Sequence, residues 1–180
     1  QRYLRGPFSG GTFCSEAQLI LKEQLTPLVS NTPVLGVKKI ADASVSEGHT
    51  LLDLGDDQFT DGRPHPMIDF SIRNQRILEE ARDPECAVIL LDLVLGYGAN
   101  PDPLSELIPT LLEAQQISKQ QGGNLPIICS VTGTDQDPQC RQQVVAALRA
   151  SGVIVARSNA YATRLALEII SGVTKDRRRR

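Results

Sequence analysis

The stretch that decides the fold is Ala87-Val-Ile-Leu-Leu-Asp-Leu-Val-Leu95, a continuous apolar run that only Asp92 interrupts. A strand covered by helices on both faces has this pattern, whereas a strand with one wet face alternates apolar and polar residues. The turn formers of Gly96-Tyr-Gly98 end the run. The pattern therefore predicts the central strand of a parallel sheet.

Shorter apolar runs on both sides of this strand alternate with longer helical patterns. Regular strand–helix alternation predicts an α/β fold: a parallel sheet of about five strands, with right-handed crossovers and helices on both faces. Asp137 is expected to cap the fourth helix, with Pro138 at its first position. Residues 27–49 have few periodic apolar positions and predict no element. The expected strands are 2–5, 51–54, 87–95, 126–131 and 153–156, and the expected helices are about 13–25, 69–83, 104–119, 138–150 and 158–170.

Composition sets limits on the class of protein. The 180 residues, 41% hydrophobic and 22% charged, suit one globular domain, which we place at residues 1–172 with a basic tail at 173–180. Only 4% of the residues are aromatic and the net charge is −2, which argues against a nucleic-acid partner. No apolar run reaches membrane-spanning length and no signal pattern is present, so we expect no membrane partner and a cytoplasmic location. The chain begins with Gln1, and we expect it to be a piece of a longer polypeptide.

The four cysteines, at positions 14, 86, 129 and 140, form no CxxC pair. They predict reduced thiols and neither a disulfide framework nor a zinc site. Cys86 and Cys129 lie in or beside apolar runs and are expected in the core. Cys14 lies near a predicted helix start, where the helix dipole would stabilise a thiolate, so it is a thiol to test.

The most ionisable segment is the loop Asp53–Asp69, which joins a predicted strand to a predicted helix. Arg63 and His65 lie in its Pro-flanked turn, and they are the candidate catalytic residues, a cation and an acid or base. Asp56 and Asp57 are candidate ligand contacts on the same loop. The alternative is a solvated acidic loop with a helix-capping aspartate.

Loops that follow parallel strands meet at one edge of a sheet, so we expect the remaining candidates to converge with this loop. Ser9-Gly-Gly-Thr12, at a predicted helix start, would bind a phosphate or carboxylate through its N–H groups. Thr132-Gly-Thr134 is a second possible anion site, although an ordinary capped helix entry explains it equally well. No phosphate-loop motif and no metal site is evident. The candidate substrate or anion contacts outside the acidic loop are Ser9, Gly10, Gly11, Thr12, Gly96, Gly98, Gly133, Thr134 and Asn159.

Several of these motifs carry a family resemblance. Gly6-Pro-Phe-Ser-Gly-Gly-Thr-Phe-Cys-Ser-Glu-Ala17 resembles the start of the carboxyl-terminal CoA-ligase domain in the α subunit of succinyl-CoA synthetases. Over about residues 4–170 the chain resembles the FdrA family of acyl-CoA-synthetase-like proteins more closely, which implies a flavodoxin-like CoA-ligase domain. The motifs that carry this second resemblance are Asp53-Leu-Gly-Asp-Asp57, Gly62–Asp69, Leu90–Gly98, Gly133-Thr134 and Asp137-Pro-Gln139.

The resemblance implies a domain that handles an acyl phosphate or an acyl-CoA together with an amino-terminal CoA-binding-like domain or a separate subunit, in an oligomer. Succinyl-CoA synthetases carry a phosphorylated histidine in a Gly-His-Ala-Gly loop, but this chain has Thr132-Gly-Thr-Asp-Gln-Asp-Pro138 there. Two alternatives stay open: a component of an oxamate carbamoyltransferase in ureide nitrogen catabolism, and a non-catalytic ligand-binding or assembly domain. CoA or an acyl or carbamoyl phosphate is the implied small molecule.

Overall fold

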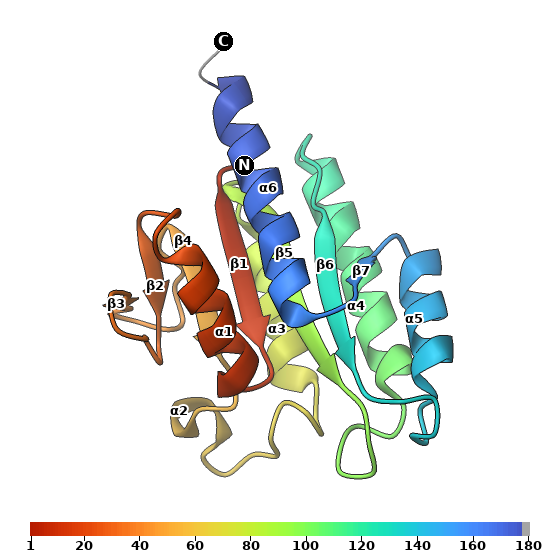
Figure 1. Ribbon diagram of the computed structural model, residues 1–180. Helices are drawn as coiled ribbons and strands as arrows, with labels where there is room; N and C mark the ends of the chain where they lie inside the picture. Colours follow the sequence, from red (N-terminus) through yellow and green to blue (C-terminus); the bar gives the residue numbers. More distant parts are fainter. Residues whose placement is uncertain (178–180) are drawn as a thin grey trace.

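The computed structural model describes residues 1–177, so the last three arginines of the expected basic tail lie outside the described residues. Within that range, seven strands form one parallel sheet in the order β3-β2-β4-β1-β5-β6-β7 (Figure 1). The strands are β1 Tyr3–Phe8, β2 Leu28–Ser30, β3 Lys38–Lys39, β4 His49–Asp53, β5 Cys86–Val94, β6 Ile127–Thr132 and β7 Ile154–Ala156.

The α/β fold with a flavodoxin-like parallel sheet is confirmed, but the count of about five strands is wrong. The two additional strands, β2 and β3, both lie in the segment 27–49, for which the sequence predicts no element. They are three and two residues long, too short to show a period-two pattern. Pairing with β4 holds β2 in the sheet, and that pairing is a tertiary contact.

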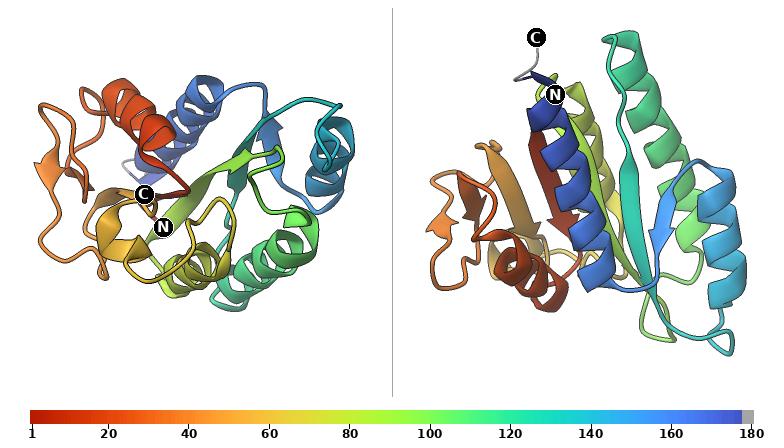
Figure 2. Two further views of the ribbon diagram at one scale, coloured as in Figure 1. Left: turned by 90° about the horizontal axis from the view of Figure 1, so that it is seen from below. Right: turned by 45° about the horizontal axis from the view of Figure 1, so that its top comes forward.

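Two layers of helices enclose the sheet. Helices α1 (Gly11–Leu21) and α6 (Asn159–Arg177) cover one face. The other face carries α3 (Ser71–Arg82), α4 (Pro103–Gln120) and α5 (Arg141–Ala150). The view from below shows both layers with the sheet between them (Figure 2). All nine residues of β5 except its last are buried, as the apolar run 87–95 predicts.

The predicted start of α5 is wrong. The helix begins at Arg141 and not at Pro138, and its N-cap is Cys140, at φ 52°. Asp137 does not cap it, because the Asp137 carboxylate accepts the N–H of Thr134 at 2.6 Å. A further turn, in which the Cys140 N–H donates to the Asp137 carbonyl at 2.8 Å, precedes the helix.

The strand order indicates the edge of the sheet at which a ligand site is expected. Going from β1, the chain builds β2, β3 and β4 on one side and then crosses to place β5 on the other side. In open parallel sheets, ligands bind outside the carboxyl ends of the strands at such a reversal. The loops after β1, β4 and β5 all leave at this edge, where the short helix α2 (Asp57–Thr60) also lies (Figure 1). No helix within residues 1–177 is long and apolar enough to cross a membrane.

Candidate functional site

The turn between β1 and α1 is anchored at the strand reversal. Ser9 is buried, and its N–H donates to Asp92 Oδ1 at 2.8 Å while its hydroxyl donates to Asp92 Oδ2. Asp92 lies in the neighbouring strand β5. The two bonds fix the backbone where it turns from the strand into the helix.

Helix α1 starts without a side-chain cap. Its N-cap is Gly10, in an extended conformation, and no side chain accepts from the first turn. A Cβ built on Gly10 would meet nothing within 4 Å, so the space in front of the turn is open. The first N–H groups of a helix lack internal partners and carry the positive end of its dipole. This turn therefore presents donors for an anion.

Asp53 ends β4 beside this turn. Its Oδ1 accepts the N–H of Gly55 at 2.9 Å, and its Oδ2 would lie 2.8 Å from a Cβ on Gly11. Only glycine at the first position of α1 leaves room for this carboxylate. Burial raises the pKa of Asp53, and the bond from Gly55 and the charge of His65 act against that rise.

The side chain of His65 also lies beside the Ser9–Thr12 turn, next to Gly55. Its Nδ1 accepts the N–H of Met67 at 3.2 Å, so the neutral ring carries its proton on Nε2. A Cβ on Gly55 would lie 2.5 Å from that Nε2 and 3.0 Å from the carbonyl oxygen of Ser9. The structure thus brings His65, Asp53 and the Ser9–Thr12 turn together, and His65 itself is exposed to solvent.

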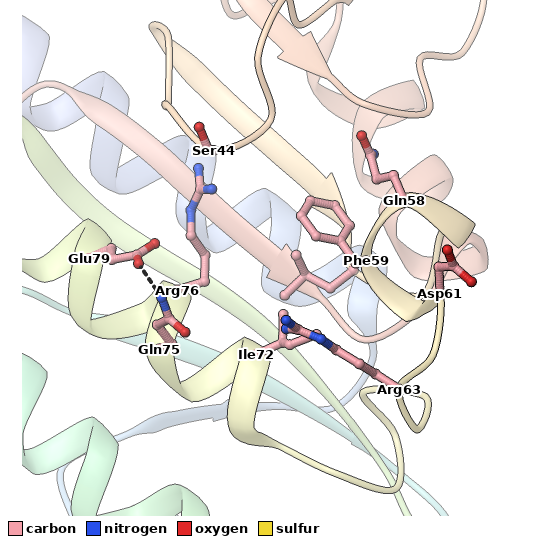
Figure 3. Close-up of a pocket in the computed structure, with 10 residues that line it drawn as sticks. Ser44, Gln58, Phe59, Asp61, Arg63, Ile72, Gln75, Arg76 and Glu79 are labelled. Carbon is pink, nitrogen blue, oxygen red and sulfur yellow. Dashed lines mark hydrogen bonds between the residues drawn. The ribbon is translucent and has the colours of Figure 1, made fainter.

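Arg63 lies elsewhere, although only one residue separates it from His65. Its side chain lines a cleft of about 460 Å³ between α2 and α3, together with Leu54, Phe59 and Ile72 (Figure 3). This cleft lies beside α3, whereas Asp53 lies against the first residue of α1. The two predicted catalytic residues therefore lie in different places.

The other acidic candidates of this loop support α2. Asp56 is the N-cap of α2, and its Oδ1 accepts the N–H of Gln58 at 3.2 Å. Asp57 is exposed in the first helical turn, where a carboxylate complements the helix dipole. These are the contacts that the capping interpretation of the loop predicts.

The glycine candidates after β5 differ in their contacts. The N–H of Gly96 donates to Gln139 Oε1 at 3.1 Å, and Gln139 Nε2 donates back to the Gly96 carbonyl at 2.9 Å. A ligand would have to displace Gln139 to reach that N–H group. Gly98 is exposed, and a Cβ built on it would meet nothing within 4 Å.

The turn after β6 is closed by a carboxylate of the chain itself. Asp137 Oδ2 accepts from the Thr134 N–H at 2.6 Å and from its hydroxyl at 3.2 Å. Gly133 has φ +148°, and a Cβ there would lie 2.7 Å from the Cβ of Leu95. An external anion at this turn would compete with Asp137.

Asn159, at the start of α6, connects that helix to α1. Its Nδ2 donates to the Phe13 carbonyl at 3.0 Å and to Glu16 Oε2 at 2.7 Å. The residue is buried, and its Oδ1 has no hydrogen-bond partner within the described part of the chain. Its contacts support the position of α1.

Sequence reasoning missed Arg73 and the role of Asp92. Arg73 is fully buried in α3, donates from Nη1 to the Asp92 carbonyl at 2.7 Å, and lies 4.0 Å from Asp92 Oδ1. Its guanidinium group stacks on Phe70 at 4.3 Å. The signal for this contact was the acidic residue inside an apolar strand, because a buried carboxylate needs a partner. The sequence does not tell which arginine supplies it.

Two further side chains lie away from the site. Cys14 is fully buried, and burial raises the pKa of its thiol to about 12, which opposes the thiolate that its place near a helix start would favour. His49 lies at the start of β4, at the opposite edge of the sheet. Its Nδ1 accepts the Leu4 N–H at 3.1 Å, and burial together with Arg5 lowers its pKa to about 4. Among the residues described, no three His, Cys, Asp or Glu side chains are grouped to hold a metal ion.

The chain is similar to a protein family and to a curated relative. The family model for CoA-ligase matches residues 8–169. The "Uncharacterized protein YahF" of Escherichia coli (strain K12) is 44% identical over 170 residues, which are 94% of this chain and 33% of that protein. The chain therefore spans about a third of the length of this curated relative.

Proposed function

The chain belongs to the CoA-ligase family, and on that basis we propose that it is the ligase-like part of an FdrA-type acyl-CoA-synthetase-like protein. In this proposal it handles an acyl phosphate or an acyl-CoA together with another domain or subunit. The observation that carries the proposal is the uncapped start of α1 at Gly10, with Asp53 and His65 beside it.

An acyl phosphate needs two things from such a site. The phosphate group leaves with the electrons of the carbon–oxygen bond when a nucleophile attacks the acyl carbon, and N–H donors at that position stabilise its charge. The first turn of α1 would supply those donors. His65 would donate from its Nε2–H group to the phosphate oxygen on which charge develops, because Nδ1 already accepts the Met67 N–H.

Asp53 has a place in the same scheme. Its Oδ1 accepts the N–H of Gly55 at 2.9 Å, and its Oδ2 faces Gly11, the first residue of α1. Burial raises the pKa of this carboxyl group. We propose that Asp53 positions the turn that binds the anion.

The carbamoyl-transfer alternative uses the same turn, because carbamoyl phosphate is itself an acyl phosphate. The non-catalytic alternative is favoured by the contacts after β6, where the Thr134 N–H group is bound by Asp137 and no histidine is present. His49 does not replace the missing phosphohistidine, since it lies at the far edge of the sheet with Nδ1 occupied.

We propose that a partner packs against the carboxyl edge. Tyr97 and Ile68 are 90% and 48% exposed there, on two loops that the hydrogen bond from Asn100 N–H to the Met67 carbonyl connects. Exposed apolar side chains on neighbouring loops are typical of a surface that another domain covers. The cysteines are all free thiols, which fits the reducing cytoplasm as the proposed location.

The test is an assay of the protein with and without its neighbouring subunits. One set of reactions contains carbamoyl phosphate and oxamate, and the other contains ATP, a carboxylic acid and CoA. We expect turnover only in the assembly, with at least a hundredfold loss in His65→Ala. Asp61→Asn, an exposed change on the same loop, is the matched control and should keep full activity. Wild-type turnover by His65→Ala in both reaction sets would refute the proposal.

A further inference from the structure

A second cleft lies at the far end of the sheet, between α5 and β7. It has a volume of about 630 Å³. Its polar wall is formed by Arg141 and Arg149 of α5, Arg157 after β7 and Asp135, and its apolar floor includes Val145 and Val155. Figure 1 shows α5 and β7 side by side at this end. The volume is in the range of pockets that hold small molecules.

The cleft carries an excess of positive charge. Three arginines and one aspartate line it, in a chain whose net charge is −2. None of the three arginines forms an ion pair with another described residue. By contrast Arg2, Arg5, Arg73 and Arg76 are each paired with a carboxylate. The arginines of this cleft are thus available for an external anion.

Contacts within the chain hold two of these side chains in place. Arg141 donates from Nε to the Val131 carbonyl at 3.0 Å, which leaves its two terminal nitrogens free. The Arg157 guanidinium group stacks on the Tyr161 ring at 4.6 Å, which leaves its edge free to donate. Asp135 Oδ1 accepts the N–H of Gln142 at 2.7 Å, so the one acidic side chain of the cleft is held against α5. Arginines held in this way lose little side-chain entropy when they bind a ligand.

The spacing of the arginines defines the shape of the ligand. Arg141 and Arg149 are eight residues apart on one face of α5, a separation of about 12 Å along the helix. A single phosphate ion is too small to contact both ends of the cleft. We propose that the cleft binds a linear polyphosphate group, either as free polyphosphate or as part of a nucleoside triphosphate. Arginine suits this ligand because its planar group donates two parallel hydrogen bonds to a phosphate.

This binding site is independent of the proposed acyl-phosphate site. The strand β7 is three strands from β1 in the sheet, about 14 Å at the usual strand spacing. None of the residues of the Ser9–Thr12 turn lines the cleft. Binding of a polyphosphate in this cleft is therefore independent of the proposed function at the Ser9–Thr12 turn.

The test is isothermal titration of the protein with tripolyphosphate, with ATP and with orthophosphate. We expect tripolyphosphate to bind at least tenfold more tightly than orthophosphate, and to bind more weakly as NaCl is raised. Equal affinities for tripolyphosphate and ATP would identify the phosphates as the whole recognition element. Tighter binding of ATP would show that the nucleoside contributes.

Arg149→Gln combined with Arg157→Gln should weaken tripolyphosphate binding at least tenfold and leave the unfolding temperature unchanged, since both side chains are exposed. Arg82→Gln is the matched control, because that exposed arginine lies at the end of α3, outside the cleft. Unchanged affinity in the double variant, no binding of tripolyphosphate to the wild type, or tighter binding of an acidic peptide that competes with it would each overturn the inference.

Discussion

Ser9 and Asp92 join the strand β1 to the strand β5 at the point where the sheet reverses its direction of growth. The Ser9 N–H and hydroxyl groups donate to the two carboxylate oxygens of Asp92, and all these groups are buried. Arg73 contacts Asp92 from α3, on the other face of the sheet. A buried charge pair thereby holds the turn whose N–H groups face the open end of the site.

The first prediction concerns this contact. Ser9→Ala removes one of the two bonds to Asp92 and leaves a buried carboxylate oxygen without a donor, so it should destabilise the protein by about 1 to 3 kcal/mol in urea unfolding. Ser15→Ala in α1 is the control and should change stability by less than about 0.5 kcal/mol. Equal losses in both variants would contradict the assigned role of Ser9.

The second prediction concerns the close approach of His65 to Gly55. A methyl group at position 55 would lie 2.5 Å from His65 Nε2 and 3.0 Å from the Ser9 carbonyl oxygen, so Gly55→Ala must displace one of them. We expect it to lower activity in the assembly sharply and to cost about 1 to 3 kcal/mol of stability. Gly172→Ala in α6, where a Cβ meets nothing within 4 Å, should leave activity intact. Full activity in Gly55→Ala would show that this contact does not position His65.

The third prediction concerns pH. The pKa of His49 is lowered to about 4 in the folded protein, mainly by burial, whereas the unfolded chain has the ordinary value of about 6.5. The unfolded state therefore binds the proton more readily, and stability should fall as the pH is lowered from about 6.5 to about 4, by about 3 kcal/mol in total. Above pH 6.5 this residue should contribute no pH dependence.

The variant that isolates the effect is His49→Asn. Asparagine keeps an acceptor for the Leu4 N–H group and has no proton to gain. Urea unfolding between pH 4 and pH 7 should show a smaller slope for this variant than for the wild type. Identical slopes in the variant and the wild type would rule out His49 as the cause.

The fourth prediction concerns thiol reactivity. Cys14, Cys86 and Cys129 are buried, and burial raises the pKa of each thiol, whereas Cys140 is partly exposed. A thiol-alkylating reagent at pH 8 should modify Cys140 first and the other three only after denaturation. Peptide mass spectrometry at successive times measures the order. Labelling of Cys14 in the native protein as fast as Cys140 would contradict its burial.

Much of the fold could be predicted from the sequence, because a long helix or strand shows its hydrophobic pattern over many residues. The run 87–95 predicts a strand buried on both faces, and β5 is such a strand. The short strands β2 and β3 could not be predicted, because two or three residues show no period. The pairing of β2 with β4, and of β3 with β2, decides their conformation. The predicted start of α5 is three residues early. The Asp137 carboxylate could accept either from the first N–H groups of the next helix or from the turn before it. Only the folded structure shows that it accepts the Thr134 N–H.

The sequence by itself determined a parallel α/β sheet, and it predicted that the loops of Ser9–Thr12 and Asp53–Asp69 meet at the carboxyl edge of that sheet. Hydrophobic periodicity and the geometry of parallel strands are sufficient for these features. Only the tertiary structure decided the composition of the site. It places His65 beside Gly55 and the Ser9–Thr12 turn, and Arg63 in a cleft with Phe59 and Ile72, because long-range packing of the loop fixes each side chain. The partners of Asp92, which lie far from it in the sequence, likewise depend on long-range packing.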